Sequence, residues 1–322
     1  MSESIHFHHG TDVLSGVLTI PSTPGPHPAI ALVPGSGAQD RDYGGMARRL
    51  SAHFARIGFA ALSWDKPGVG QSAGDFNQQT LYDRAEETIA AVRYLQGRAD
   101  IRKDCVGLWG HSQGGMVVPI AAAKSKDIAF LIEVSGWQGP AWQQDAIRVE
   151  AELRADGFSE EDVHQARDFA RKRMDLIRGN GDFEELEAAQ QHVKDFPWFA
   201  AVHLCDRTLF YAARRNVNLD VTSAWEGVHC PVLVLYGDKD TSGGPPEPLI
   251  DIIRKGLTRA QNDRVRVQVF HHADHCLYAS DTGSSKEAKE RARQRGDNPP
   301  EFAAGYLETM AAWLKEVARP GG

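Results

Sequence analysis

The fold is decided by residues 106–115, which read VGLWGHSQGG. An apolar run, Val106 to Trp109, leads into the pattern G-x-S-x-G around Ser112, and a helix-compatible stretch, Met116 to Ala123, follows. A serine on a sharp strand-to-helix turn has a strained backbone that small flanking residues tolerate, and its hydroxyl stands exposed above the sheet. The first NH groups of the helix point to the same spot and favour developing negative charge. This context predicts that Ser112 is a nucleophile.

Short apolar runs recur on both sides of this stretch, and amphipathic helical patterns separate them. Helical spacing of apolar residues runs from Met46 to Ile57 and from Leu81 to Val92, and each pattern stops at a glycine. The apolar runs fit strands that are buried on both faces of a sheet: Ala29 to Val33, Phe59 to Trp64, Val106 to Trp109, Phe130 to Val134 and Val232 to Tyr236. This alternation predicts a mostly parallel sheet with helices on both faces.

Two further stretches predict the edges of the sheet. Residues Ile5 to His8 and Val13 to Ile20 flank turn residues, which indicates an antiparallel hairpin at one edge. Late in the chain, the valines of residues 265–269 alternate with Arg266 and Gln268. One face of that strand is therefore expected to meet water, as at the opposite edge.

The strand signals vanish between about residues 137 and 228, where the chain reads as helical with charged runs. We predict a core in two parts, residues 1–136 and 229–322, with an inserted helical cap formed by residues 137–228. The cap is rich in aromatic residues, which would either form its packing core or line a pocket. Trp142 and Trp198 are the first candidates for substrate-binding residues in such a pocket.

Composition limits the classes of function. With 322 residues, 42% of them hydrophobic, and a net charge of -7, the chain fits one large globular domain with or without an insert. The chain has no domain-scale excess of basic residues, so we do not expect it to bind nucleic acid. No segment approaches the roughly 18 apolar residues that a membrane-spanning helix needs, so we expect a cytoplasmic protein without membrane insertion. The 4 cysteines are widely spaced, which argues against a disulfide framework or a structural zinc site.

A serine nucleophile needs a base, and the chain contains 13 histidines. His275 is our candidate, because residues 270–275, FHHADH, leave the last alternating strand at a point where a loop can return over the edge of the sheet. His271 and His272 in the same loop are the alternatives.

The base in turn needs an orienting acid. The buried run Val232 to Tyr236 ends in residues 237–240, GDKD, and Asp240 is our candidate for the acid. We interpret Asp238 as a turn-forming residue. Glu133, at the end of the preceding strand, is the alternative acid.

The oxyanion hole is predicted in residues 31–37, ALVPGSG, where a strand runs into a glycine-rich loop. Such a loop lets backbone NH groups converge on one point. The NH group of Ser36 is the first candidate donor, together with the NH of Gln113, and Gly37 is the next candidate. The alternative interpretation is a tight turn without a catalytic role.

These motifs resemble the α/β-hydrolase superfamily, and most of all its bacterial serine esterases. Residues 35–42, GSGAQDRD, are similar to the G-S-G-x-x-D-R-D loop of those enzymes, and residues 110–115 to their G-H-S-x-G-G motif. Residues 65–72, DKPGVGQS, resemble the turn D-x-R-G-x-G-x-S. Two positions depart from the pattern. Pro67 replaces the usual arginine, and Pro34 replaces a histidine that typically braces the oxyanion loop.

The resemblance implies an α/β-hydrolase fold, with a mostly parallel eight-stranded sheet, helices on both faces and an inserted helical cap. It also implies hydrolysis of a carboxylic ester through Ser112, His275 and Asp240, with an acyl-enzyme intermediate and without a metal or organic cofactor. The aromatic residues of the cap favour a small-molecule ester with an apolar part. Thioesterase, lactonase, amidase or carbon-carbon hydrolase activity with the same residues stays open, as does a non-catalytic small-molecule binding protein on this fold.

Overall fold

A sheet of eight strands forms the centre of the computed structural model, which describes residues 1–202, 204–296 and 298–319. The strand order is β1-β2-β4-β3-β5-β6-β7-β8, and the mostly parallel sheet predicted from the sequence is confirmed. β1 pairs antiparallel with β2, and β2 antiparallel with β4, while every other neighbouring pair is parallel. The strands are β1 (Ser2–His9), β2 (Asp12–Thr19), β3 (His27–Val33), β4 (Ala60–Trp64), β5 (Ile101–His111), β6 (Leu131–Val134), β7 (Val232–Gly237) and β8 (Val265–Phe270).

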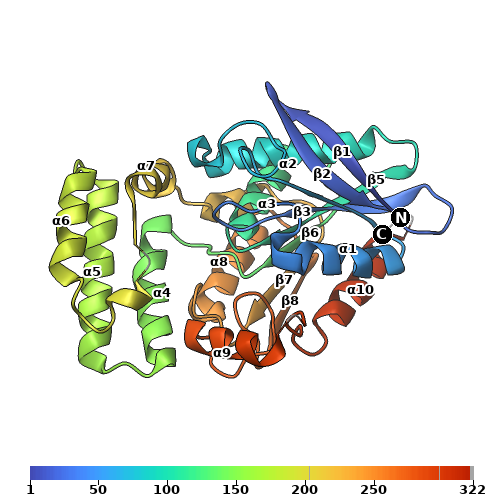
Figure 1. Ribbon diagram of the computed structural model, residues 1–322. Coiled ribbons are helices and arrows are strands. Elements are labelled where there is room, and N and C mark those ends of the chain that lie inside the picture. The colour runs from blue at the N-terminus through green and yellow to red at the C-terminus, as the bar shows by residue number, and fades with distance from the viewer. Residues whose placement is uncertain (203, 297, 320–322) are drawn as a thin grey trace.

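Helices cover both faces of the sheet (Figure 1), because successive residues of a strand point to opposite faces. In β3, Ala29 and Ala31 pack on one face and Ile30 and Leu32 on the other. The first face is covered by α2 (Leu81–Gln96), α3 (Gln113–Lys124) and α8 (Pro246–Arg259). The second is covered by α1 (Met46–Arg56) and α10 (Tyr306–Val317).

The segment between β6 and β7 is helical and stands beside the core as a separate layer (Figure 1). It contains α4 (Ala141–Asp156), α5 (Glu160–Arg178), α6 (Phe183–Val193) and α7 (Arg207–Asn216), which bury apolar residues among themselves. Its two ends behave differently, since Trp137 and Trp225 pack into the main core of the sheet. The part that packs away from the sheet is therefore narrower than the predicted range of residues 137–228.

One charged helix, α9 (Ser285–Arg295), follows β8 and lies against α4. None of its residues is buried, and its contact with the cap includes a hydrogen bond between Ser285 and Glu152. Over the described ranges, no helix has both the length and the apolar character required to cross a bilayer.

Candidate active site

The turn between β5 and α3 holds Ser112 in a strained conformation. Its backbone angles are φ 57° and ψ -121°, in a region that side chains with a Cβ rarely adopt. The NH of Ser112 donates to the carbonyl of Val134 at 2.9 Å, which ties the turn to β6. A Cβ on Gly114 would lie 2.1 Å from the oxygen of Val33, and one on Gly110 would lie 2.4 Å from the oxygen of Gly114. Only glycine therefore fits at these two positions of the G-x-S-x-G motif.

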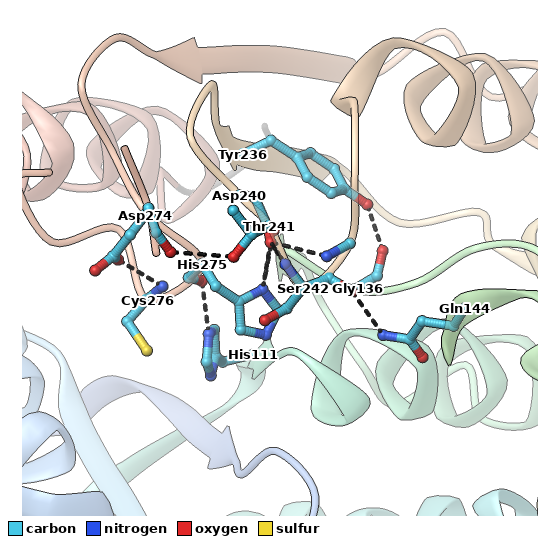
Figure 2. Close-up of polar contacts among 12 residues, drawn as sticks. His111, Gly136, Gln144, Tyr236, Asp240, Thr241, Ser242, Asp274, His275 and Cys276 are labelled. Atoms are coloured by element: carbon cyan, nitrogen blue, oxygen red, sulfur yellow. Dashed lines mark hydrogen bonds and ion pairs between the residues drawn. The ribbon is translucent and has the colours of Figure 1, made fainter. Parts of the chain in front are cut away.

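His275 and Asp240 form a hydrogen-bonded pair at the ends of two different loops (Figure 2). Nδ1 of His275 lies 2.9 Å from Oδ2 and 3.0 Å from Oδ1 of Asp240. Oδ1 of Asp240 also accepts from the NH groups of Ser242 and Gly243, each at 2.8 Å. Burial alone would lower the pKa of His275, but the Asp240 carboxylate outweighs it and the pKa lies above its ordinary value. The pair is thus arranged to hold a proton on Nδ1.

The alternative bases lie at the surface. The side chains of His271 and His272 are 87% and 72% exposed, respectively. Nδ1 of His271 is 3.2 Å from Oδ2 of Asp238, so that Asp238 pairs with a surface histidine. The structure therefore brings His275, and neither neighbour, to a buried carboxylate.

Glu133, the alternative acid, is buried beside the start of the cap. Its Oε1 accepts from the NH of Gly136 at 2.5 Å, and from the amide of Gln138 and the hydroxyl of Tyr236 at 3.3 and 3.4 Å. Burial raises the pKa of Glu133 well above its usual range. Its contacts hold the junction between β6 and the cap, while Asp240 is the carboxylate that meets His275.

Ser112 and His275 both line a cavity of about 500 Å³. The core supplies Pro34, Gly35, Ser36, Tyr43 and Met46 to the lining, and α4 of the cap supplies Ala141, Gln144, Asp145 and Arg148. Ser112 and His275 thus open onto a space that is bounded by both core and cap.

The loop after β3 runs directly past Ser112. A Cβ on Gly35 would lie 3.3 Å from Cβ and 3.7 Å from Oγ of Ser112. Ser36 follows and lines the cavity, and the direction of its backbone NH stays a prediction. Gly37 has a φ of 77° and accepts a hydrogen bond from Lys66 at 2.9 Å. Gly37 is not among the lining residues, so it shapes the turn rather than the cavity wall. Gln113, the other predicted donor, is not among them either, and the role of its NH group stays a prediction.

Sequence reasoning missed three residues around the site. His111 lines the cavity, and its ring contacts His275 (Figure 2). Lys66 and Arg84 are buried basic residues that donate to carbonyl groups of the loop after β3. A signal for Arg84 exists in the sequence, since it falls on the apolar stripe of α2 that contains Leu81 and Ala85. A charged residue in such a stripe must find a buried partner.

The two tryptophans proposed for the pocket require a correction. Trp198 packs inside the cap, with its ring centroid 5.8 Å from that of Phe169. Trp142 lines a different cavity, and the guanidinium of Arg178 lies 4.4 Å from its ring centre. The reason is helical geometry: at 3.6 residues per turn, Trp142 is about a third of a turn away from the face of α4 that lines the catalytic cavity.

Known proteins share parts of this sequence. Residues 30–283 match the Alpha/beta hydrolase family. Among curated proteins, Esterase EstD of Thermotoga maritima is 30% identical over 117 residues, which make up 35% of this chain and 28% of that protein. An uncharacterized 31.7 kDa protein of Escherichia coli is 29% identical over 79 residues, which make up 24% of this chain and 28% of that protein. The matches thus span under a third of these relatives.

Solved structures share the fold over nearly the whole chain. The 2,6-dihydroxy-pseudo-oxynicotine hydrolase has a TM-score of 0.59 at 20% identity, covering 98% of this chain and 68% of its own. Est1E from Butyrivibrio proteoclasticus, solved with ferulic acid, has a TM-score of 0.56 at 19% identity, covering 97% of this chain and 96% of its own. Identities this low show the fold alone. Since the family match itself extends over residues 30–283, the chain belongs to the alpha/beta hydrolase family.

Proposed function

We propose that this protein is a serine hydrolase that cleaves a carboxylic ester. The observation that carries the proposal is the shared cavity: a serine with a strained backbone and a histidine bound to a buried carboxylate line the same space. This combination supplies a nucleophile, a base and an orienting acid. One relative named above supports ester chemistry, since it is called an esterase.

The proposed reaction has two acyl-transfer steps. Oγ of Ser112 attacks the ester carbonyl carbon while Nε2 of His275 takes the hydroxyl proton. The backbone NH groups of Ser36 and Gln113 donate to the resulting oxyanion. The carbon–oxygen bond to the alcohol then breaks, and the alcohol leaves with the proton from His275. Water, deprotonated by His275, attacks the acyl-enzyme in the same way and releases the acid, while Asp240 keeps the imidazole in the required tautomer.

The cavity lining favours a small ester with one apolar and one polar part. Met46 and Tyr43 offer apolar surface on the core side. Gln144, Asp145 and Arg148 offer hydrogen-bonding and charged groups on the cap side. An apolar group of the substrate would therefore lie along the core wall, with its polar atoms toward α4.

A fluorophosphonate probe tests the chemistry, because it reacts with an activated serine and leaves a covalent adduct. Mass spectrometry is expected to place the adduct on Ser112, and Ser112→Ala is expected to be unlabelled and to lose about six orders of magnitude in turnover. Ser4→Ala, on the exposed side of β1, is the matched control and should label normally. An adduct on another serine, or an active Ser112→Ala, would overturn the proposal.

A substrate panel separates the ester from related acyl groups. Activated esters, thioesters, lactones and anilides with matched acyl chains can all react through the same residues. We expect kcat/KM to be highest for the esters. If the protein neither reacts with the probe nor hydrolyses any of these substrates, the alternative is a non-catalytic small-molecule binder on this fold.

A further inference from the structure

The oxyanion loop rests on two buried cations that the catalytic steps above do not use. Lys66 follows β4 and is 1% exposed, and its Nζ donates to the carbonyl oxygens of Gly35 at 3.0 Å and Gly37 at 2.9 Å. Arg84 lies on α2 and is 4% exposed. Its guanidinium donates to the carbonyl oxygen of Pro34 and to the side-chain oxygen of Gln113, each at 2.7 Å. We call Lys66 and Arg84 the buried cation pair.

The surroundings of the buried cation pair supply little opposite charge. Over the described ranges of the chain, neither cation forms a salt bridge with a carboxylate. The carboxylate that faces both is Glu87, whose oxygens accept from Trp64 and Gln79, each at 2.6 Å. Burying cations without direct counter-charges is unfavourable for folding. Their main hydrogen-bond acceptors are carbonyl groups of the loop that passes the nucleophile, which indicates a role at the site.

The geometry of the peptide bond links the hydrogen bond at the Gly35 carbonyl to the direction of the Ser36 NH. The bond between Gly35 and Ser36 is trans, so the carbonyl of Gly35 and the NH of Ser36 point in opposite directions. Because Lys66 holds that carbonyl, the NH of Ser36 points away from Lys66. Gly35 and Ser36 line the catalytic cavity, and Lys66 does not. The second proposed donor is the NH of Gln113, the first residue of α3, whose side-chain oxygen accepts from Arg84.

We propose that Lys66 and Arg84 are positioning residues of the oxyanion hole, which hold the loop carbonyls from behind so that the NH groups of Ser36 and Gln113 face the cavity. The hydrogen bond from Lys66 to the carbonyl of Gly35 also polarises the peptide unit between Gly35 and Ser36, which strengthens the NH of Ser36 as a donor. This inference rests on the proposed function, because it concerns the oxyanion of that reaction.

The surroundings of Lys66 control its protonation state. Burial and the neighbouring guanidinium of Arg84 lower the pKa of Lys66 to about 6, against the opposing effect of Glu87. The ring of Phe76, whose centre lies 5.2 Å from Nζ, covers the amine from another side. Lys66 can donate as an ammonium or as a neutral amine. A negative oxyanion close by favours the ammonium form.

A tetrahedral adduct measures the proposed role directly. Ser112 adds to the carbonyl carbon of a trifluoromethyl ketone, its proton passes to His275, and the ketone oxygen becomes the oxyanion. We expect Lys66→Met to weaken this adduct and to lower kcat by the same factor, about 10- to 100-fold, with KM nearly unchanged. That is less than the about 10²- to 10³-fold loss when an oxyanion donor itself is removed. Lys66→Gln keeps a donor and should recover part of the loss.

Arg41→Met is the matched control for general loosening of the loop. Arg41 belongs to the same loop but pairs with Asp65, to which its guanidinium donates at 2.5 Å. Arg41→Met should lower thermal stability. It should not weaken the ketone adduct more than it weakens substrate binding. If Lys66→Met does not fold, Arg84→Lys carries the test, because lysine cannot reach Pro34 and Gln113 together.

The outcomes separate this inference from the proposed function. A wild-type protein that forms no ketone adduct overturns both. A wild-type protein that forms it, with Lys66→Met binding the ketone equally well, overturns the role of the buried cation pair alone. A loss that Arg41→Met reproduces in the adduct and in kcat would also overturn it, since the cations would then act only through stability.

Discussion

Nε2 of His111 lies 2.9 Å from the backbone oxygen of His275, and the centres of the two imidazole rings are 5.0 Å apart (Figure 2). A carbonyl oxygen only accepts, so Nε2 of His111 carries a proton and donates it. Burial and the nearby His275 lower the pKa of His111 to about 4, which keeps its ring neutral near pH 7. The residue before Ser112 therefore holds the loop that carries His275.

Removing the hydrogen bond between His111 and His275 is expected to make the position of His275, the proposed base, less fixed. His111→Ala should lower kcat/KM by about tenfold, which corresponds to about 1.4 kcal/mol and to the net value of one buried hydrogen bond. Steady-state kinetics with an activated ester measures the loss. His111→Gln keeps an NH donor and should be the better enzyme of the two. Equal activity of His111→Ala and the wild type would show that the loop is held by other contacts.

The pH dependence of kcat/KM is expected to follow His275. Only the neutral ring accepts the proton of Ser112, and the pKa of His275 is raised, so activity should rise through a midpoint above the ordinary value of about 6.5. Asp240→Asn removes the charge that raises the pKa and leaves burial to lower it. The midpoint should therefore move to lower pH, while the maximal rate falls by about 10⁴-fold.

Asp238→Asn is the matched control for this profile, because Asp238 pairs with the exposed His271. Its midpoint and its maximal rate should stay close to those of the wild type. A profile that moves in Asp238→Asn and not in Asp240→Asn would reassign the acid.

Glu133→Gln tests the buried alternative acid. Since burial raises the pKa of Glu133, its folded-state carboxyl keeps a proton above pH of about 4.3, where the unfolded chain loses it. Folding is then linked to proton uptake, and this group makes the protein less stable as pH rises. Glutamine has no proton to lose, so the stability of Glu133→Gln relative to the wild type should increase with pH. Denaturant unfolding at several pH values measures this, and kcat should stay within a few-fold.

The parallel strands could be predicted because they are buried on both faces and so form unbroken apolar runs. β7, predicted as Val232 to Tyr236, ends only one residue later, at Gly237. β5 was harder, since it begins at Ile101 while the apolar run begins at Val106. Lys103 and Asp104 at its start are exposed, and polar residues of this kind look like a turn in the sequence.

The site, like the fold, has parts that the sequence predicts and parts that it does not. Ser112 could be found because strand, turn and helix are adjacent in the chain. The contact between Arg84 and Pro34 joins residues 50 positions apart, and no local pattern encodes it. The lining of the cavity by Arg148 rather than Trp142 depends on how α4 docks on the core, which is a property of tertiary packing.

The last prediction concerns the cap face of α4, where Arg148 meets the cavity and pairs with Asp145 at 3.1 Å and Glu152 at 2.9 Å. Arg148→Met removes the charge but keeps the length of the side chain. Asp145 keeps its partner Arg173, and Glu152 keeps its contact with Ser285, so the cap should stay folded. We expect kcat/KM to shift toward esters with longer apolar acyl groups. The shift should be about 10- to 200-fold, the range that pocket contacts give.

Trp198→Leu provides the contrast, because Trp198 is buried inside the cap and does not line the cavity. Its truncation should cost stability, up to the about 3–5 kcal/mol of a full tryptophan deletion, and leave the ranking of acetate, butyrate and octanoate esters unchanged. Thermal unfolding and kcat/KM for these esters measure both effects. If Trp198→Leu changes the ranking and Arg148→Met does not, then the cap selects substrates through its own packing, and the face of α4 that carries Arg148 serves only to hold the cap on the core.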